Sequence, residues 1–163
     1  MKITTFFTFI LVFATTWVGA QSISEHTLGL RLGDSDGFGA EISYQRGLGD
    51  NNRLEVDLGW RSANQFNAFR LTGLYQWVWN IDGNLNWYAG AGGGLGQFDF
   101  DDDFPGGDNF SKTFFYVAGD IGIEYDFDFP LLLSLDFRPE LGINNDVDDD
   151  IDFDIALGIR YQF

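Results

Sequence analysis

The side chains of this chain that could do chemistry are almost all carboxylates. The sequence holds 25 Asp and Glu, 9 Lys and Arg, no Cys and a single histidine, His26. With no thiol and one imidazole, the chain cannot form a thiolate zinc site, an iron–sulfur cluster or a metal site of several histidines. The formal net charge of -16 also argues against nucleic acid as a partner, because nucleic acid is bound by basic surfaces.

Carboxylates are densest in two stretches, residues 99–108 and 146–154. Alternate residues of an extended strand share one face at a repeat of ~6.6 Å, which brings four aspartates of the second stretch together. Because hard cations such as Ca²⁺ take carboxylate oxygens, the candidate calcium ligands are Asp148, Asp150, Asp152 and Asp154. The other interpretation, which we favour, is a hydrated surface loop whose charge prevents edge pairing. Apart from this calcium we expect no cofactor.

Nothing in the spacing of the polar residues is typical of catalysis. The sequence has no nucleophile elbow, phosphate-binding loop or metal-ligand triad, and His26 is the only imidazole available as a base. Pairs of carboxylates are abundant, but in so acidic a chain their abundance does not identify a hydrolytic cleft. We therefore predict that the protein is not an enzyme.

The elements that must position these groups are strands, because apolar residues recur at every second position. In residues 53–61, for example, Leu54, Leu58 and Trp60 fall on one face and charged residues on the other. The same test predicts eight strands, at residues 27–33, 38–46, 53–61, 66–79, 85–98, 114–125, 131–141 and 153–163. Some of them reach the ~9–11 residues that a tilted strand needs to cross a bilayer.

Alternation alone fits either a soluble barrel with an apolar interior or a membrane barrel with an apolar exterior. Three features favour the membrane barrel. Small residues, as in the glycine run of residues 90–96, accompany charged ones on the polar face, which suits a crowded interior. The longest connections, residues 99–113 and 142–152, fall at one end. Aromatic residues collect at two rims: Tyr44, Trp77, Trp79, Trp87, Tyr125, Tyr161 and Phe163 at one, and Phe38, Trp60, Phe69, Phe115 and Phe153 at the other.

The fold class that these features predict is all-β, an eight-stranded antiparallel up-and-down transmembrane β-barrel. Only a closed barrel satisfies every backbone hydrogen-bonding group in hydrocarbon, so the first strand should pair with the eighth. Pro139 falls inside the seventh predicted strand. Because proline cannot donate to a ladder, we expect a bulge or the start of the outer rim there.

Residues 1–20 have the layout of a secretory signal peptide. Lys2 precedes an apolar run that ends at Ala20, and we expect cleavage before Gln21. A retained membrane-anchor helix is the alternative, disfavoured because no basic stop-transfer flank follows the run. The predicted domains are therefore a cleavable signal peptide at 1–20 and a barrel domain at 21–163.

The end of the chain is similar to the C-terminal signal of bacterial outer-membrane β-barrels. Apolar residues alternate up to the terminal Phe163, and Tyr161 supplies an aromatic ring two positions before it. In length and layout the chain resembles the small eight-stranded outer-membrane β-barrel family, the OmpX/OmpA-like proteins often labelled as porin family. The resemblance implies residence in the bacterial outer membrane, contact with its lipid, delivery by periplasmic chaperones and insertion by the barrel-assembly machinery. The assembly signal would comprise Leu157, Ile159, Tyr161 and Phe163.

The polar face of the predicted barrel carries charges of both signs. These inward residues are Arg31, Arg53, Arg61, Arg70, Arg138, Arg160, Glu41, Glu55, Asp57, Asp120, Glu124, Asp136 and Glu140. Because an eight-stranded barrel has room only for its own side chains, we expect an ion-pair network that plugs the bore.

The function that we predict is a structural or surface-contact role, adhesion or binding through the acidic outer loops. The protein would be a monomer in lipid, with a surface protein or a cell as its partner. One alternative is a narrow passive channel or a small-ligand binder. The other is a lipid-modifying enzyme of the kind found among small barrels, but His26 lies at the start of the first predicted strand, directly before residue 27, at the periplasmic end and away from that chemistry.

Overall fold

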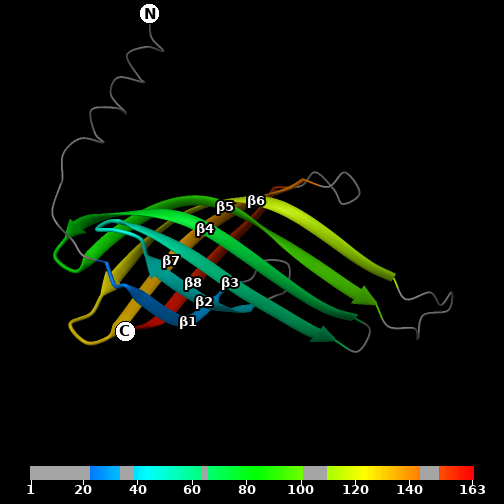
Figure 1. Ribbon diagram of the computed structural model, residues 1–163, viewed down its shortest axis with the longest axis horizontal. Helices are drawn as coiled ribbons and strands as arrows, with labels where there is room; N and C mark the ends of the chain where they lie inside the picture. Colours follow the sequence, from blue (N-terminus) through cyan, green and yellow to red (C-terminus); the bar gives the residue numbers. More distant parts are fainter. Residues whose placement is uncertain (1–22, 34–38, 64–65, 101–109, 144–150) are drawn as a thin grey trace, which may run out of the picture.

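The computed structural model describes residues 23–33, 39–63, 66–100, 110–143 and 151–163. The strands are β1 (His26–Leu32), β2 (Ala40–Gly47), β3 (Asn52–Ala63), β4 (Phe66–Asp82), β5 (Leu85–Phe100), β6 (Phe110–Asp126), β7 (Leu131–Gly142) and β8 (Ile151–Gln162). Each strand pairs antiparallel with the next, and together they close into a barrel in chain order (Figure 1). No helix in this part of the chain has the length and apolarity needed to cross a membrane.

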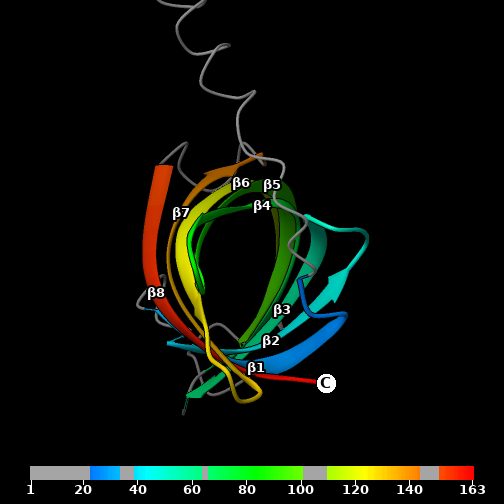
Figure 2. The ribbon, with the colours of Figure 1, turned by 90° about the vertical axis from the view of Figure 1, so that its left-hand side faces the viewer.

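Closure of the barrel pairs the first strand with the last. β1 pairs with β8 from Thr27 opposite Gln162 to Leu32 opposite Leu157, and the ribbon seen from the end forms a complete ring (Figure 2). The amide of Phe163 donates to the carbonyl of His26 at 3.0 Å, which extends this seam by one step. The closed antiparallel barrel predicted from the sequence is confirmed, including the pairing of the first strand with the last.

The apolar side chains of the strands point outward and the polar side chains point inward. On β8, Leu157 and Tyr161 are 45% and 58% exposed, whereas Arg160 between them is fully buried. A soluble barrel would bury the apolar set, because burial of apolar surface is what drives a soluble chain to fold. The observed arrangement suits a barrel whose exterior meets hydrocarbon, as predicted.

Aromatic side chains pack against one another at both rims. At the end that holds the termini, the rings of Trp79 and Trp87 stack with centroids 4.4 Å apart. At the other end, the rings of Phe137 and Phe153 stack at 5.6 Å, and Trp60 lies opposite Phe69 in the β3–β4 register. Of the predicted rim aromatics, Phe38 lies outside the described residues.

Three consecutive strands in the middle of the sequence are longer than the sequence predicts. β4, β5 and β6 have 17, 16 and 17 residues, more than the ~9–11 needed to span hydrocarbon. Their ladder continues until Phe66 lies opposite Phe100 and Phe100 lies opposite Phe110. These strands, with the end of β3, project beyond the rest of the ring at the end away from the termini (Figure 1).

Of the two outcomes expected at Pro139, a bulge or the start of the outer rim, the structure shows no bulge in β7. β7 keeps one register against β8 along its whole length, and one register against β6 on both sides of the proline. The β6–β7 ladder instead lacks the pairs at Gly119 and Asp120. Gly119 leaves space for the proline ring, because a Cβ there would lie 3.3 Å from Pro139 Cγ. The missing amide therefore interrupts the ladder without shifting it.

Candidate functional site: the charged bore

Inward side chains from all eight strands meet in the bore. Because successive strand residues face opposite sides, every second residue of each strand reaches the same interior. Five arginines are at least 97% buried there: Arg31, Arg53, Arg70, Arg138 and Arg160. A buried guanidinium is tolerated only when carboxylates and other acceptors surround it, so the bore is organised around these five groups.

Arg31 on β1 forms ion pairs with three carboxylates. Its Nη2 lies 2.5 Å from Asp136 Oδ1, and its Nη1 lies 2.6 Å from Asp154 Oδ2 and 3.1 Å from Glu41 Oε2. Its Nε also donates to Asp136 at 3.0 Å. One guanidinium thus links β1 to β2, β7 and β8 through ion pairs.

Arg138 on β7 reaches across the bore to the opposite wall. Its Nη2 lies 2.7 Å from Asp57 Oδ2 and 3.1 Å from Glu55 Oε1, both on β3. The same Glu55 also pairs with Arg160 of β8, at 3.3 Å. Contacts between β3 and β7 or β8 cross the interior, because these strands are not neighbours in the ring.

Arg70 on β4 combines ionic and aromatic contacts. It forms ion pairs with Glu140 and, at 3.6 Å, with Glu41. Its guanidinium carbon lies 4.8 Å from the centroid of the Tyr116 ring, and its Nε donates to the hydroxyl of that tyrosine at 3.0 Å. The cation–π contact adds to the ion pairs, since the ring face is negative.

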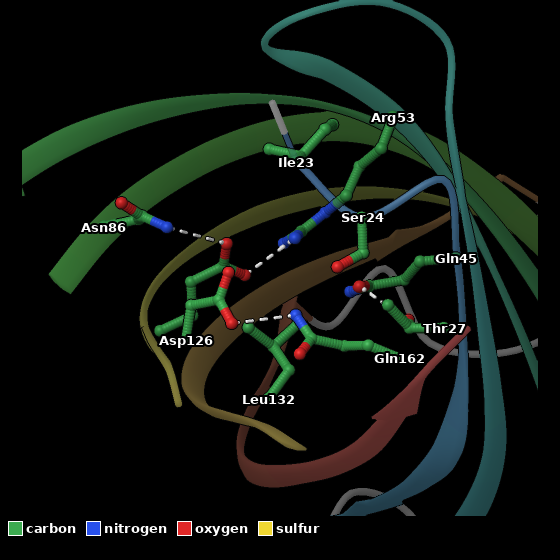
Figure 3. A pocket seen from close by; sticks show the side chains of 10 residues that line it. Ile23, Ser24, Thr27, Gln45, Arg53, Asn86, Asp126, Leu132 and Gln162 are labelled. Atoms are coloured by element: carbon green, nitrogen blue, oxygen red, sulfur yellow. Dashed lines mark hydrogen bonds and ion pairs between the residues drawn. The ribbon is translucent and has the colours of Figure 1, made fainter. Parts of the chain in front are cut away.

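At the end of the bore where β1 begins and β8 ends, polar side chains surround a small pocket (Figure 3). Arg53 pairs with Glu124 at 2.7 Å and donates to Gln76 at 2.5 Å. Gln162 donates to Asp126 at 3.0 Å beside them. This pocket has a volume of about 10 Å³, the lower limit for a single water molecule.

Glycines make space for the large interior side chains. A Cβ at Gly122 would lie 2.5 Å from the Tyr88 ring, and one at Gly94 or Gly96 would overlap the rings of Tyr116 and Phe114. The inward glycines of β5 and β6 therefore accommodate aromatic rings in a narrow interior, which is the role expected of the glycine run.

Most of the predicted inward residues are buried together in the bore. The exception is Arg61, which lies exposed at the loop end of β3, beyond the buried part of the interior. The sequence analysis missed Asp154 as a bore residue and missed the uncharged partners. These partners are Ser43, Gln45, Thr72, Gln76, Asn86, Tyr88, Tyr116 and Ser134. Their positions in the period-two alternation predict that they face inward, but a search restricted to charged residues misses them.

The candidate calcium ligands do not act as one group in the described part of the chain. Asp148 and Asp150 lie outside the described residues. Asp152 is exposed, whereas Asp154 is buried and pairs with Arg31. No group of three or more His, Cys, Asp or Glu side chains placed to hold a metal occurs in the described residues.

The residues of the predicted assembly signal all face outward. Leu157, Ile159, Tyr161 and Phe163 are each at least 40% exposed. The Phe163 ring stacks on His26 with centroids 5.6 Å apart, and His26 Nδ1 lies 2.7 Å from the Tyr44 hydroxyl. His26 thus lies at the seam between β1 and β8, at the end of the barrel that holds the C-terminus.

Comparison with known proteins finds relatives by structure alone, since no family model and no curated protein sequence matches the chain. Neisserial surface protein A has a TM-score of 0.60 and 16% identity over 85% of this chain and 94% of its own. The N-terminal β-barrel domain of Pseudomonas aeruginosa OprF has a TM-score of 0.59 and 15% identity over 89% and 100%. Ail, the attachment invasion locus protein of Yersinia pestis, has a TM-score of 0.57 and 15% identity over 88% and 99%. The chain has the fold of the small eight-stranded outer-membrane β-barrels, as the sequence resemblance predicted.

Proposed function

We propose that this protein is an outer-membrane barrel with a plugged bore that acts by contact at its outer surface. It would be exported with a signal peptide at 1–20, surrounded by outer-membrane lipid and monomeric. The long loops would face the cell exterior, and the short turns and both termini the periplasm. The role involves no turnover and no cofactor.

The observation that carries this proposal is the filling of the bore by paired arginines. Arg31, Arg138 and Arg160 contact carboxylates on strands that are not their neighbours, so their side chains cross the interior. The pocket at the end where β1 begins has a volume of about 10 Å³. An interior filled in this way would leave a ligand or an ion no room to pass, so we assign the function to the ends of the barrel.

Contact at the loop end is supported by the shape of that end and by its relatives in structure. β4, β5 and β6 project beyond the rest of the ring at the end away from the start of β1 (Figure 1). Ail is an attachment protein and Neisserial surface protein A a surface protein. Ail has also been crystallised with sucrose octasulfate, a heparin analogue. With 25 acidic against 9 basic residues, the present chain would repel such a ligand, so its partner should be neutral or basic.

The proposal is tested with the whole chain displayed on cells that lack other adhesins. We expect binding to a surface coated with a basic protein, and no retention on heparin beads. Replacing residues 101–109 or 144–150 by Gly-Ser segments of equal length should reduce the binding without changing the amount of folded barrel. Binding that survives both replacements would refute a contact role for the loops.

A passive channel is the competing function, favoured only by the charged character of the interior. Purified protein in a planar bilayer should give no discrete conductance steps, because the ion pairs block the path. Steady steps in the wild type would overturn the plugged bore. Lipid A mass spectra that change with expression of the protein would overturn the absence of catalysis.

We also propose that Phe163 and the alternate residues before it are read during assembly. The exposure of Leu157, Ile159 and Tyr161 on β8 is compatible with recognition by chaperones and the barrel-assembly machinery before the strand meets β1. The Asp-rich loops are proposed to be hydrated surfaces without a defined calcium site, since Asp154 already pairs with Arg31.

A further inference from the structure

The bore contains more buried carboxylates than guanidinium groups. The buried carboxylates of the described residues are Glu41, Glu55, Asp57, Asp120, Glu124, Asp136, Glu140 and Asp154. The buried arginines number five, so eight acids minus five bases leaves three acids in excess. Charge of one sign enclosed in a low-dielectric interior is strongly unfavourable, so the excess must be offset inside the barrel.

Of these buried carboxylates, Asp120 has the weakest ion-pair and hydrogen-bond contacts in the described part of the chain. Each of the other seven pairs with an arginine, but Asp120, only 5% exposed, forms no ion pair with the described residues. Its Oδ2 accepts a hydrogen bond from Gln76. Its Oδ1 is buried and has no hydrogen-bond partner. An anion with one free buried oxygen and no cation keeps most of the cost of leaving water.

Asp120 interacts electrostatically with groups on the surrounding strands, and Arg138 is the one cation among them. These groups are Glu55 from β3, Tyr88 from β5, and Asp136 and Arg138 from β7. Two are acids, and the guanidinium of Arg138 is already shared by Glu41, Glu55 and Asp57. The surroundings therefore repel a negative charge on Asp120 more than they attract it.

We propose that the bore contains a proton-binding site at Asp120 and that this carboxyl group is neutral in the folded barrel at neutral pH. The proton replaces the arginine that Asp120 lacks and removes one of the three excess charges. An aspartate in the unfolded chain is ionised at pH 7, so the folded state binds a proton that the unfolded state does not. The free energy of unfolding therefore falls as pH rises and that proton is lost. The site is independent of whether the loops bind a partner.

The test compares two isosteric changes on one strand, Asp120→Asn and Glu124→Gln, in the purified full-length barrel refolded into lipid vesicles. The urea midpoint of the wild type should fall between about pH 6 and about pH 9, where ordinary Asp and Glu no longer titrate. The midpoint of Asp120→Asn should stay near the wild-type value at pH 6 throughout this range. Glu124→Gln removes the partner of Arg53 and should have a lower midpoint at every pH.

Infrared spectroscopy of the folded protein gives a direct measurement that does not depend on either variant's stability. A carbonyl band of a protonated carboxyl group should be present in the wild type at neutral pH, disappear at alkaline pH and be missing from Asp120→Asn. No such band in the wild type, or an unchanged band in the variant, would overturn the proposal. A wild-type midpoint that follows sodium or potassium concentration at fixed pH and ionic strength would also overturn it, because a metal ion would then replace the proton.

Discussion

Replacing Leu157 with arginine tests the orientation of the two barrel faces. Leu157 points outward from β8 and is 45% exposed, and it lies between Leu32 and Leu135 on the neighbouring strands. Along the outward face it is midway between the rim residues Phe153 and Tyr161. If this face meets hydrocarbon, a guanidinium here is placed near the middle of the bilayer, where arginine costs about 2–4 kcal/mol.

Ile151→Arg is the matched control, because Ile151 lies on the same strand and the same face. Six residues separate the two positions, which is ~20 Å along a strand and ~15 Å in depth at a tilt of ~40°. That distance exceeds half of the apolar band of ~25 Å, so a charge at residue 151 should cost ~0–1 kcal/mol. The expected difference between the variants is therefore at least ~1 kcal/mol.

The measurement is reversible unfolding in urea of both variants and the wild type, refolded into phosphatidylcholine vesicles and followed by tryptophan fluorescence. Refolding in vitro avoids any effect on the assembly machinery, which is relevant because Leu157 belongs to the proposed signal. Equal costs at the two positions, or a harmless Leu157→Arg, would mean that the apolar face does not lie in hydrocarbon and that the assignment of inside and outside is wrong.

Three further predictions follow from the bore, the loops and the seam. Arg138→Ala should lower the free energy of unfolding by about 3–5 kcal/mol, because it leaves the buried Asp57 without its arginine. Arg61→Ala at the exposed end of β3 should change the free energy by no more than ~0.5 kcal/mol; similar losses in urea titrations would contradict the network. Calcium and magnesium at equal ionic strength should raise the melting temperature by the same small amount, also in the Asp148→Ala/Asp150→Ala double variant; a gain specific to calcium that the double variant loses would establish a calcium site. Phe163→Ala should reduce the folded barrel in outer membranes several-fold while costing ~1 kcal/mol in vitro from the lost ring contact with His26; normal assembly in cells would refute its role as a signal.

The sequence was sufficient to predict the eight strands and their closure because alternation has a period that no helix shares. The sequence was less informative about where β4, β5 and β6 end in the part of the barrel that projects beyond the ring. Asp99 and the acidic residues after it suggested a loop from residue 99, yet Asp99 lies opposite Asn67 and Ser111 within continuous ladders. Where a strand extends beyond the membrane, its residues need not be apolar. Composition therefore cannot show where such a strand ends.

The side of the barrel on which each residue lies could be predicted, but its partners could not. Arg31 pairs with Asp136 and Asp154, which are 105 and 123 residues away in the sequence. Such pairs depend on the stagger of the strands around the ring and on which side chains cross the interior, and neither is encoded in local pattern. Asp154 illustrates the difficulty, since one column of aspartates on β8 contains both the exposed Asp152 and the buried partner of Arg31.

The charged bore and the apolar exterior are two consequences of one requirement. A strand with apolar residues on both faces would read as a continuous apolar run, and a long run of that kind is held in the first membrane that an exported chain meets. Polar residues at every second position keep β3 and β8 free of such runs while leaving one complete face for the final bilayer. The interior must then contain charges in a space without bulk water, and the pairing of Arg31, Arg138 and Arg160 with carboxylates across the bore makes that tolerable. On this argument the ion pairs offset a cost set by export, and replacing Arg138 together with Asp57 by apolar residues of similar size should leave the refolded barrel as stable as the wild type in vesicles.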